Sequence, residues 1–564
     1  MNLKINLLAL SCLLLQICFG QATQHTKDEN TLFQFQEKLQ AAIHKALSAS
    51  VLITTHERLT PTGGVTASGV CVSADGIIMT AGHLTVPNGK YEVTFPDGKK
   101  LNALGLGKIG MLDVGLLKIT EKGVFPFAEK GFSSGLAIGE TCFSIAYPGS
   151  FSSKKVVRLG QVKNVYDSPD GDIRTRNIQT TCLMEPGDSG GPVFDLDGRV
   201  IGIRSFIGMA LDENYDVPVD AYRKYWDILL SGENFNGIPK HNPKLLVEKR
   251  NAVLWNDWSK LLSTQSIKNS KFVVEISSEV DDKSNKVLGT VVNISAFLSK
   301  KNDKKYTYII SKNSEIGKNA KLKMGDKWID LKPIYSDVEK DLVLLKAIGK
   351  LDDVNAISID PKSRVVNNIG SILLSSMPHK QAVLGVSSAE KISLPSVFNK
   401  GYLGVRLESQ NGKNLITQVQ PNSAASQVGL NIGDEILAFD FVPIDAPETF
   451  IQSLKTKKVN DLITLVRQNN EKKDTLSIKL LAKPAPIKTH IAEKFTDGKS
   501  SRRDDFKSVF IQDATIKPSE CGGPVFDLFG MLQGINIARY SRVSSLVMPI
   551  EEIVDFIGTF SKLK

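Results

Sequence analysis

The sequence predicts a mainly β protein of several domains, built from a duplicated β-barrel unit with a small α+β domain inserted in the second copy. Three observations support this prediction. At 564 residues the chain is too long for one hydrophobic core. From Val51 onward, short alternating strands are punctuated by glycine, aspartate and proline, as in barrels and sandwiches. Two motifs also recur in the same order in both halves of the chain, which indicates a duplicated domain.

The composition is that of a globular protein, with 41% hydrophobic and 23% charged residues. The net charge of +10 comes mostly from lysines spread along the chain, and basic runs such as Ser501-Arg502-Arg503 are short. A solvated lysine-rich surface explains this pattern better than a polyanion site. We therefore expect no nucleic-acid partner.

The first 22 residues read as a signal peptide. Lys4 precedes the mostly apolar stretch Ile5–Phe19, and the small residues Gly20 and Ala22 offer cleavage points. A membrane anchor is the alternative, but the stretch is shorter than the roughly 20 residues that span a bilayer. We therefore expect an exported protein, periplasmic or secreted, without a stable membrane span.

The mature chain would keep four cysteines, which is too few for a disulfide framework in a chain of this size. Cys71, Cys142 and Cys182 lie in alternating strand patterns, where buried free thiols are the default. A bridge between Cys142 and Cys182 stays open as the less favoured alternative. No residue spacing indicates a metal site, and no organic cofactor is expected.

The predicted domains follow in order along the chain. A lead-in helix over Leu32–Leu47 opens the first barrel domain (32–231), and a helix over Tyr222–Leu230 closes it. A linker rich in glycine, asparagine and proline follows at 232–250. The second barrel domain is expected over 251–398 plus 484–562, with the inserted domain at 400–482.

The repeats define the second barrel and its insertion. Residues 186–196 read PGDSGGPVFDL and residues 518–528 read PSECGGPVFDL, while DVGLLK (113–118) returns as DLVLLK (341–346). The distance between the two motifs differs between the copies. In the first, 76 positions separate Asp113 from Ser189, whereas in the second 180 separate Asp341 from Cys521. The additional 104 positions are enough for a small domain.

The first copy contains the residues of a nucleophilic serine site. A serine hydroxyl needs a base to take its proton, and the base needs a partner that fixes its tautomer. His83 follows an apolar strand, Asp113 heads another, and Ser189 lies in the glycine turn GDSGGP. That turn can direct the backbone N–H groups of Gly187 and Ser189 at an oxyanion. We expect His83, Asp113 and Ser189 to be a catalytic triad.

These residues resemble those of the chymotrypsin-like serine peptidases, and within them the high-temperature-requirement (HtrA, or Deg) family of exported proteases. The stretches SGVCVSADGIIMTAGH, MLDVGLLKI and EPGDSGGPVFDLDGRVIGI carry the resemblance over about residues 35–230. It implies two trypsin-like double β-barrel domains in tandem, and polypeptide substrates that are unfolded or exposed. Members of this family often form trimers, so a homo-oligomer is one expectation, although the second barrel could occupy the surfaces that trimerisation would use.

The resemblance also indicates where substrate side chains would bind. In chymotrypsin-like folds the floor of the specificity pocket lies about six residues before the serine, which is Leu183 here. An apolar floor favours an aliphatic residue before the scissile bond over Lys or Arg. Ser205 and Phe206, with Ile207, are expected to form the strand along which a substrate backbone pairs.

The second copy has lost most of this chemistry. It keeps Asp341, but Ser314 stands where His83 does, Cys521 replaces the nucleophile and Ser519 replaces the turn glycine. A nucleophilic cysteine also needs a base, and His379 and His490, the two histidines of this half, are not in the matching position. We expect a degenerate barrel, a pseudoprotease that packs, binds or regulates.

The inserted segment resembles a PDZ domain. Its Tyr402-Leu403-Gly404-Val405 matches the loop whose N–H groups receive a peptide carboxylate, and the run from Ala424 to Ile436 is also typical. A peptide would add as a strand beside Leu403–Leu407, against a helix at Pro447–Lys455. An ordinary α+β insert without a ligand is the alternative. In HtrA proteins this module follows the protease, whereas here it interrupts the second copy.

The sequence therefore predicts an exported serine endopeptidase that cleaves unfolded or exposed segments, with the second half recruiting or regulating. A non-catalytic scaffold that captures peptides through the PDZ domain is the alternative from another class. A protease dedicated to one processing event is the third interpretation.

Overall fold

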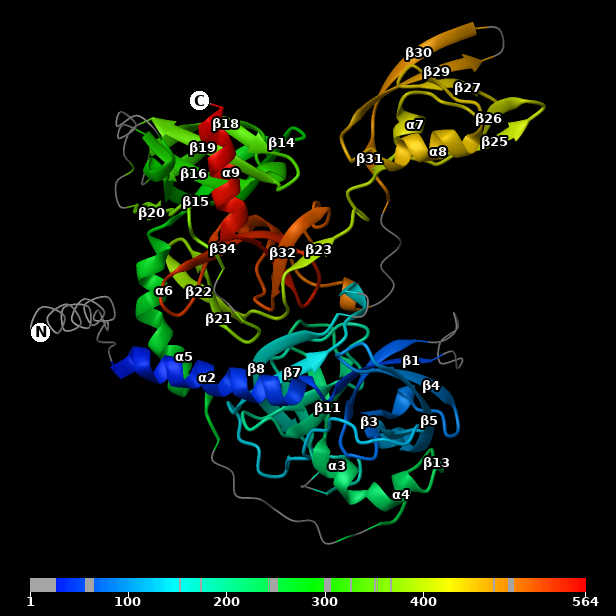
Figure 1. Cartoon of the computed structure of the whole chain (residues 1–564), viewed down its shortest axis with the longest axis vertical. Helices are drawn as coiled ribbons and strands as arrows, with labels where there is room; N and C mark the ends of the chain where they lie inside the picture. The colour runs from blue at the N-terminus through cyan, green and yellow to red at the C-terminus, as the bar shows by residue number, and fades with distance from the viewer. Residues whose placement is uncertain are drawn as a thin grey trace, which may run out of the picture.

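The computed structural model describes residues 27–563, apart from 56–64, 152–153, 173–174, 242, 244–251, 299–305, 325–326, 349–350, 352–353, 366–367, 470–471 and 485–490. The predicted signal peptide (1–22), part of the predicted linker and His490 lie outside these residues. Two β-rich domains lie against each other, and a smaller one projects from the second on two connecting segments (Figure 1). No helix within the described ranges has the length and apolar character needed to cross a membrane.

The first domain contains two β-sheets, each closed on itself. One runs in the order β13-β5-β4-β1-β2-β3-β6 and closes through β5 and β6; the other is a closed barrel, β10-β11-β12-β9-β8-β7. The strands are β1 Ser50–Thr55, β2 Thr66–Cys71, β3 Ile77–Ala81, β4 Lys90–Thr94, β5 Lys100–Ile109, β6 Val114–Ile119, β7 Thr141–Ala146, β8 Val156–Tyr166, β9 Asn177–Thr180, β10 Pro192–Phe194, β11 Val200–Ile207, β12 Asn214–Pro218 and β13 Asn234–Phe235.

The helix predicted over Tyr222–Leu230 is wrong in its bounds. The structure has two short helices instead, α3 (Val219–Lys224) and α4 (Trp226–Leu230). They are separated by Tyr225, whose φ of −108° and ψ of 18° leave the helical region. The apolar spacing continued across the break, so the sequence pattern gave no sign of it.

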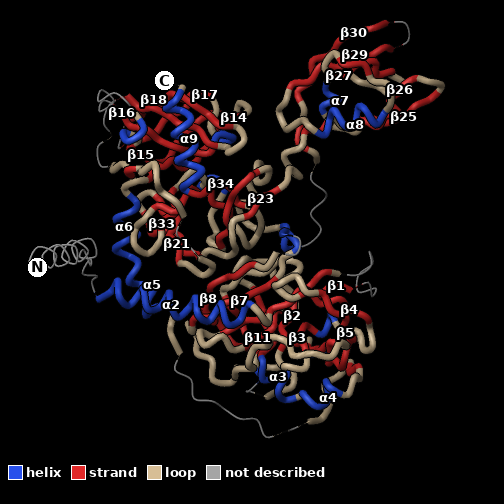
Figure 2. Tube along the Cα trace, in the orientation of Figure 1, coloured by secondary structure: helices blue, strands red, loops and turns tan. Residues whose placement is uncertain are grey.

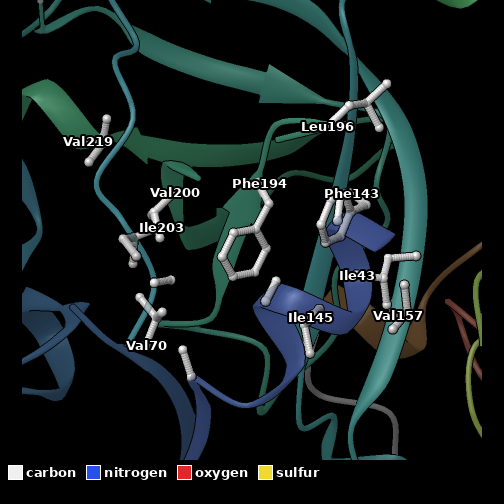
Figure 3. Packing of buried hydrophobic residues seen from close by; sticks show 14 of the residues in the cluster. Ile43, Val70, Phe143, Ile145, Val157, Phe194, Leu196, Val200, Ile203 and Val219 are labelled. Atoms are coloured by element: carbon white, nitrogen blue, oxygen red, sulfur yellow. The ribbon is translucent and has the colours of Figure 1, made fainter. Parts of the chain in front are cut away.

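The core of the first domain is completed by the lead-in helix α2 (Lys27–Leu47). Ile43 of this helix faces Phe143, Val157 and other apolar side chains of the second barrel (Figure 3). The same helix reaches the second domain, where Phe35 stacks on Trp258 with ring centroids 4.1 Å apart. One amphipathic helix thus contributes to both domains.

The second domain repeats this architecture, as the duplicated motifs predicted. Its first sheet runs β14-β17-β18-β19-β16-β15-β20 and closes through β14 and β15, and its second runs β22-β21-β33-β34-β35-β32-β23. The elements are α5 Trp255–Ser259, α6 Ser263–Ser270, β14 Val273–Val280, β15 Lys283–Asn293, β16 Tyr306–Lys312, β17 Lys318–Met324, β18 Lys327–Asp337, β19 Leu342–Ile348, β20 Ile357–Ser358, β21 Ile372–Met377, β22 Lys380–Val386, β23 Ile392–Leu394, β32 Phe506–Gln512, β33 Pro524–Phe526, β34 Leu532–Arg539, β35 Ser545–Pro549 and α9 Ile550–Lys562.

The inserted α+β domain lies between the counterparts of β8 and β9. It consists of β24 Gly401–Tyr402, β25 Val405–Gln410, β26 Lys413–Val419, α7 Ala424–Gln427, β27 Glu435–Phe439, β28 Val442–Pro443, α8 Pro447–Lys455, β29 Leu462–Asn469, β30 Lys472–Lys479 and β31 Leu481–Ala482. Its two connecting segments meet at Asp504, which accepts a hydrogen bond from Asn399 N–H at 3.1 Å. Figure 2 shows that strands and loops dominate all three domains.

Candidate active site

His83 and Asp113 meet at the edge of the first sheet of the first domain. Strand β3 ends at Ala81, and a 3₁₀ turn over Gly82–Leu84 directs the imidazole outward. The Nδ1 atom of His83 lies 3.0 and 3.1 Å from the two carboxylate oxygens of Asp113. The backbone N–H of His83 donates to the same carboxylate at 2.7 Å, so the ring is fixed on both sides. The His83 side chain remains 48% exposed.

Ser189 joins this pair through Ser205. The Ser189 hydroxyl donates to the carbonyl of Ser205 at 3.3 Å, and the Ser205 hydroxyl makes a short hydrogen bond with Asp113. Among the described contacts, the Ser189 hydroxyl bonds this carbonyl and not the His83 ring. The three predicted catalytic side chains are thus brought to one place, with the serine turned toward Ser205.

The glycine turn around Ser189 exposes two backbone donors. Gly187 has a φ of +99°, a conformation that favours glycine. The carbonyl of Pro186 is turned away, toward Gly149 N–H, which donates to it at 2.8 Å. The carbonyl of Gly187 accepts from the Ser68 hydroxyl at 2.8 Å. Within the described part of the chain, the N–H groups of Gly187 and Ser189 have no acceptor, as an oxyanion hole requires.

A buried ion pair supports this turn from below. Asp188 is fully buried, and Arg158 of β8, itself 1% exposed, donates to it at 2.8 Å. Glu185 N–H donates to the same carboxylate at 2.8 Å. Burial raises the pKa of Asp188 and the charge of Arg158 opposes that shift. The aspartate next to the serine therefore holds the backbone in place and does not face the site.

Leu183 and Phe206 lie on either side of the serine segment. Leu183 is partly exposed just before the turn. Phe206 of β11 is 57% exposed and stacks on Tyr215 of β12, with centroids 4.7 Å apart. The structure places Ser205 differently from these two, since it is 8% exposed and its hydroxyl contacts Asp113. Leu183, six residues before Ser189, and Phe206, next to Ser205, are thus both apolar and at least partly exposed.

The second copy keeps the backbone of the triad positions but not its chemistry. Asp341 has the same left-handed conformation as Asp113, with φ of 57° and 54°. Ser314 takes the position of His83, and its N–H donates to Asp341 at 2.7 Å. The ammonium group of Lys312, completely buried, makes a short ion pair with Asp341. The carboxylate of Asp341, whose counterpart in the first copy contacts His83, is therefore paired with a buried lysine.

Cys521 is completely buried in this copy. Its N–H donates to the carbonyl of Pro518 at 3.2 Å, because Pro518–Glu520 form a 3₁₀ turn. Burial raises the pKa of the Cys521 thiol to about 11. The thiolate, which is the nucleophilic form of cysteine, is therefore disfavoured near neutral pH.

The four cysteines in the described part of the chain are free and buried, as the strand patterns predicted for Cys71, Cys142 and Cys182. The Cys142 and Cys182 side chains contact each other, and that contact raises the pKa of Cys142. Within the described residues no group of three or more His, Cys, Asp or Glu side chains could hold a metal ion.

The loop of the inserted domain also leaves backbone donors free. Gly404 has a φ of +85°, and a Cβ there would lie 2.2 Å from the Ser423 side chain. In the described residues the N–H groups of Leu403 and Gly404 have no acceptor, while their carbonyls bind Ala425 and Gln420. The predicted strand over Leu403–Leu407 begins only at Val405, because this loop precedes it. Tyr402 ends the short strand β24.

Sequence reasoning missed three supporting residues. Arg158 holds Asp188, Gly149 holds the Pro186 carbonyl and Ser68 binds the Gly187 carbonyl. Gly149 and Arg158 lie outside the quoted motifs, and Ser68 opens one of them, but the role of each depends on a contact made in the folded barrel. Ser205 was singled out for another role, and its place one strand after the nucleophile was the signal that could have linked it to Asp113.

Comparison with known proteins identifies two domains. Residues 67–203 match the trypsin-like peptidase domain, and residues 401–480 match the PDZ domain. A putative protease Do-like 14 of Arabidopsis thaliana is 32% identical over 171 residues, which are 28% of this chain and 39% of that protein. The serine protease HTRA1 of Xenopus tropicalis is 32% identical over 163 residues, or 28% of this chain and 35% of that protein.

Solved structures give a looser likeness. An HtrA-type protease AlgW variant with a decapeptide has a TM-score of 0.29 and 15% identity, over 80% of this chain and 99% of that one. A serine endoprotease from Yersinia pestis has a TM-score of 0.30 and 14% identity, over 79% and 98%. The chain therefore contains a trypsin-like peptidase domain and a PDZ domain. It is similar to these Do-like and HTRA1 proteases, and it spans less than two fifths of the length of those curated relatives.

Proposed function

We propose that this chain is an exported serine endopeptidase that cleaves unfolded or exposed protein segments at the Ser189 site. The observation that supports this best is the connected set of His83, Asp113, Ser205 and Ser189 beside two backbone N–H groups without acceptors. A nucleophile, a base with its orienting carboxylate and an oxyanion hole are the parts of an acyl-transfer site.

The proposed reaction has two halves. A substrate carbonyl enters between Ser189 and the N–H groups, and the hydroxyl turns from Ser205 toward His83. His83 Nε2 takes the Ser189 proton as Oγ bonds to the carbonyl carbon, and the oxyanion is bound by the N–H groups of Gly187 and Ser189. His83 then gives the proton to the departing amine as the peptide C–N bond breaks. Water, deprotonated by His83, releases the acyl group and restores Ser189.

The walls of the site favour apolar substrates. Leu183 supplies apolar surface before the turn, and Phe206 is exposed on β11. We expect an aliphatic residue before the scissile bond, since these walls offer no carboxylate to pair with Lys or Arg. The substrate backbone would pair with β11 as an added strand.

The PDZ domain would recruit the substrate. A peptide C-terminus would bind the free N–H groups of Leu403 and Gly404, and its preceding residues would add as a strand between β25 and α8. The degenerate barrel carries this domain on its two connecting segments (Figure 1). Recruitment and cleavage would then occur in different domains of one chain.

Degradation of denatured casein tests the proposal. The unmodified chain is expected to produce fragments, Ser189→Ala to produce none, and the matched variant Cys521→Ala to behave as the unmodified chain. Fragments from Ser189→Ala would contradict the role of Ser189. Intact casein together with covalent labelling of Ser189 by a fluorophosphonate would instead indicate a dedicated processing peptidase, and intact casein without labelling would indicate a scaffold.

A further inference from the structure

The loop between β7 and β8 of the first domain is embedded in the second domain. Phe151 on this loop is 5% exposed, and it belongs to a buried cluster otherwise formed almost entirely by second-domain side chains. Its ring stacks on Tyr540, with centroids 4.6 Å apart and an interplanar angle of 21°. Tyr540 lies in the turn 540–544 between β34 and β35. The degenerate barrel thus fixes a loop of the active one.

The same loop orients the peptide bond that precedes the oxyanion turn. Gly149 N–H donates to the Pro186 carbonyl at 2.8 Å, and the Ser150 hydroxyl makes a short hydrogen bond with Glu185. Tyr540 donates its phenolic hydrogen to the carbonyl of Ser150 at 3.0 Å. A continuous set of contacts therefore leads from Tyr540 to the backbone that presents the Gly187 N–H.

A second contact from the same turn reaches another loop of the first domain. Arg542, 1% exposed, donates to the carbonyl of Ala210 at 2.7 Å, on the loop that joins β11 to β12. The charge of Glu185 acts on both Arg539 and Arg542, where it opposes the lowering of their pKa by burial. On its own domain Glu185 faces Asp188 and Arg158. The turn 540–544 thus contacts two loops of the first domain, the one that follows β7 and the one that follows β11.

We propose that Tyr540 and Arg542 of the degenerate barrel are positioning residues of the Ser189 site, so that the second domain supplies part of the support that the first needs to hold its oxyanion hole. The inference rests on the proposed peptidase function. It gives the degenerate barrel a role that does not depend on Cys521: its β34–β35 turn holds the Pro186–Gly187 peptide in the orientation that exposes two donors. Two barrels of one chain then form one catalytic unit.

A time course of fluorophosphonate labelling, followed by intact mass, tests this in the full chain. Each variant gives a rate constant for phosphonylation and a final labelled fraction. Misfolding lowers the labelled fraction, whereas a misplaced oxyanion hole lowers the rate of the molecules that are labelled. Tyr540→Ala and Arg542→Gln are compared with Tyr540→Phe, which keeps the ring stack. The matched control is Tyr335→Ala, which removes a similar contact with Phe556, at 5.0 Å, inside the second domain.

We expect Tyr540→Ala and Arg542→Gln to slow labelling by about tenfold or more, because loss of an oxyanion donor costs at least this much. Tyr540→Phe should stay within about threefold, the effect of one neutral hydrogen bond. Tyr335→Ala should label at the unmodified rate. Should Tyr540→Ala fail to fold, the labelling rate of Arg542→Gln, compared with that of Tyr335→Ala, tests the inference.

The contrary results separate two failures. Unmodified rates in Tyr540→Ala and Arg542→Gln would overturn the inference alone, and so would an equal loss of rate in Tyr335→Ala. No labelling of the unmodified chain would overturn the proposed function, and with it the inference.

Discussion

In the first barrel the carbonyl of Pro186 accepts a hydrogen bond from Gly149, whereas in the second the carbonyl of Pro518 accepts one from Cys521 N–H. The first arrangement leaves the N–H of Ser189 free for a substrate. The second uses the corresponding N–H inside a 3₁₀ turn. The two copies share seven identical residues after the nucleophile position, so this difference arises from the residues before that run and from the loop that contacts them.

Two features separate the surroundings. In the first barrel a long loop between β7 and β8 brings Gly149 to the Pro186 carbonyl, whereas β21 and β22 are joined by Pro378 and His379 alone. The left-handed Gly187 also has Ser519 as its counterpart, and Ser519 lies in a 3₁₀ turn. The second copy therefore differs from the first in the loop and the glycine that leave two N–H groups free, in addition to Ser314 and Cys521 at the positions of His83 and Ser189.

Replacing Gly187 by serine, the residue at the matching position 519 of the second copy, is expected to lower activity more than any of the changes that follow. In Gly187→Ser a Cβ would lie 2.6 Å from the Gly149 nitrogen and 2.7 Å from the Tyr147 carbonyl oxygen, at a φ of +99°. The turn must move, so kcat for casein fragments should fall about 10²–10³-fold, as when an oxyanion donor is removed. Ser519→Gly in the second copy is the control and should leave kcat unchanged. A fully active Gly187→Ser would show that the turn geometry is not needed.

Removing the buried lysine of the second copy should affect stability and not activity. Lys312 and Asp341 are both completely buried, and Lys312→Met would remove the nearer cation and leave the carboxylate with Arg502 at 3.8 Å and the hydrogen bonds of Ser314. The free energy of unfolding should fall by about 3 kcal/mol, read from the first transition in urea. The double variant with Asp341→Leu should recover most of this loss, since an apolar pair replaces the ion pair. An unchanged single variant would contradict the role of the ion pair.

The Ser205 hydroxyl should have a smaller effect on catalysis. Ser205→Ala removes its hydrogen bond to Asp113 but keeps the backbone that pairs with substrate. A hydrogen bond to a charged group is worth about 1.5–3 kcal/mol, so kcat should fall about tenfold or more. The strand registers place Ile537 at the matching position of the second copy, and Ile537→Ser should create no activity there. Full activity of Ser205→Ala would remove Ser205 from the site.

The Cys521 thiol should show the smallest response. Its pKa is raised to about 11, so it remains protonated at pH 8, where a free cysteine with a pKa near 8.5 is partly thiolate. Iodoacetamide should therefore leave Cys521 unmodified at pH 8 in the folded chain and alkylate it in urea, as read by peptide mass. The retained proton stabilises the fold below about pH 9, and this contribution is lost as the pH rises toward 11. Rapid alkylation of the folded chain at pH 8 would contradict a protonated, buried thiol.

The sequence was sufficient for the fold because repeats and local motifs encode it. The alternating strands and the two PVFDL motifs predicted the duplicated β domains, and the insertion followed from the unequal spacing of the motifs. The contacts that hold the residues of the site in place could not be predicted from the sequence. Arg158 is 30 positions from Asp188, and Tyr540 is 390 positions from Ser150. Such contacts depend on how strands and domains pack, which no local pattern records.

The contact between Lys312 and Asp341 could not be predicted from the sequence either, although Lys312 lies close to a predicted triad position. It lies two residues before Ser314 at the end of β16, where Ala81 ends β3 in the first copy. A lysine at a strand end ordinarily faces solvent. Only the folded barrel shows it buried against Asp341, the counterpart of the Asp113 that faces His83 in the first copy.

The most direct measurement is the intact mass of the mature chain after exposure to a fluorophosphonate, with peptide mapping of the adduct. We expect one adduct per chain, on Ser189, which disappears in Ser189→Ala and persists in Cys521→Ala. An adduct on another residue, or none in the presence of a denatured protein as activator, would contradict the assignment of the first barrel as the active one.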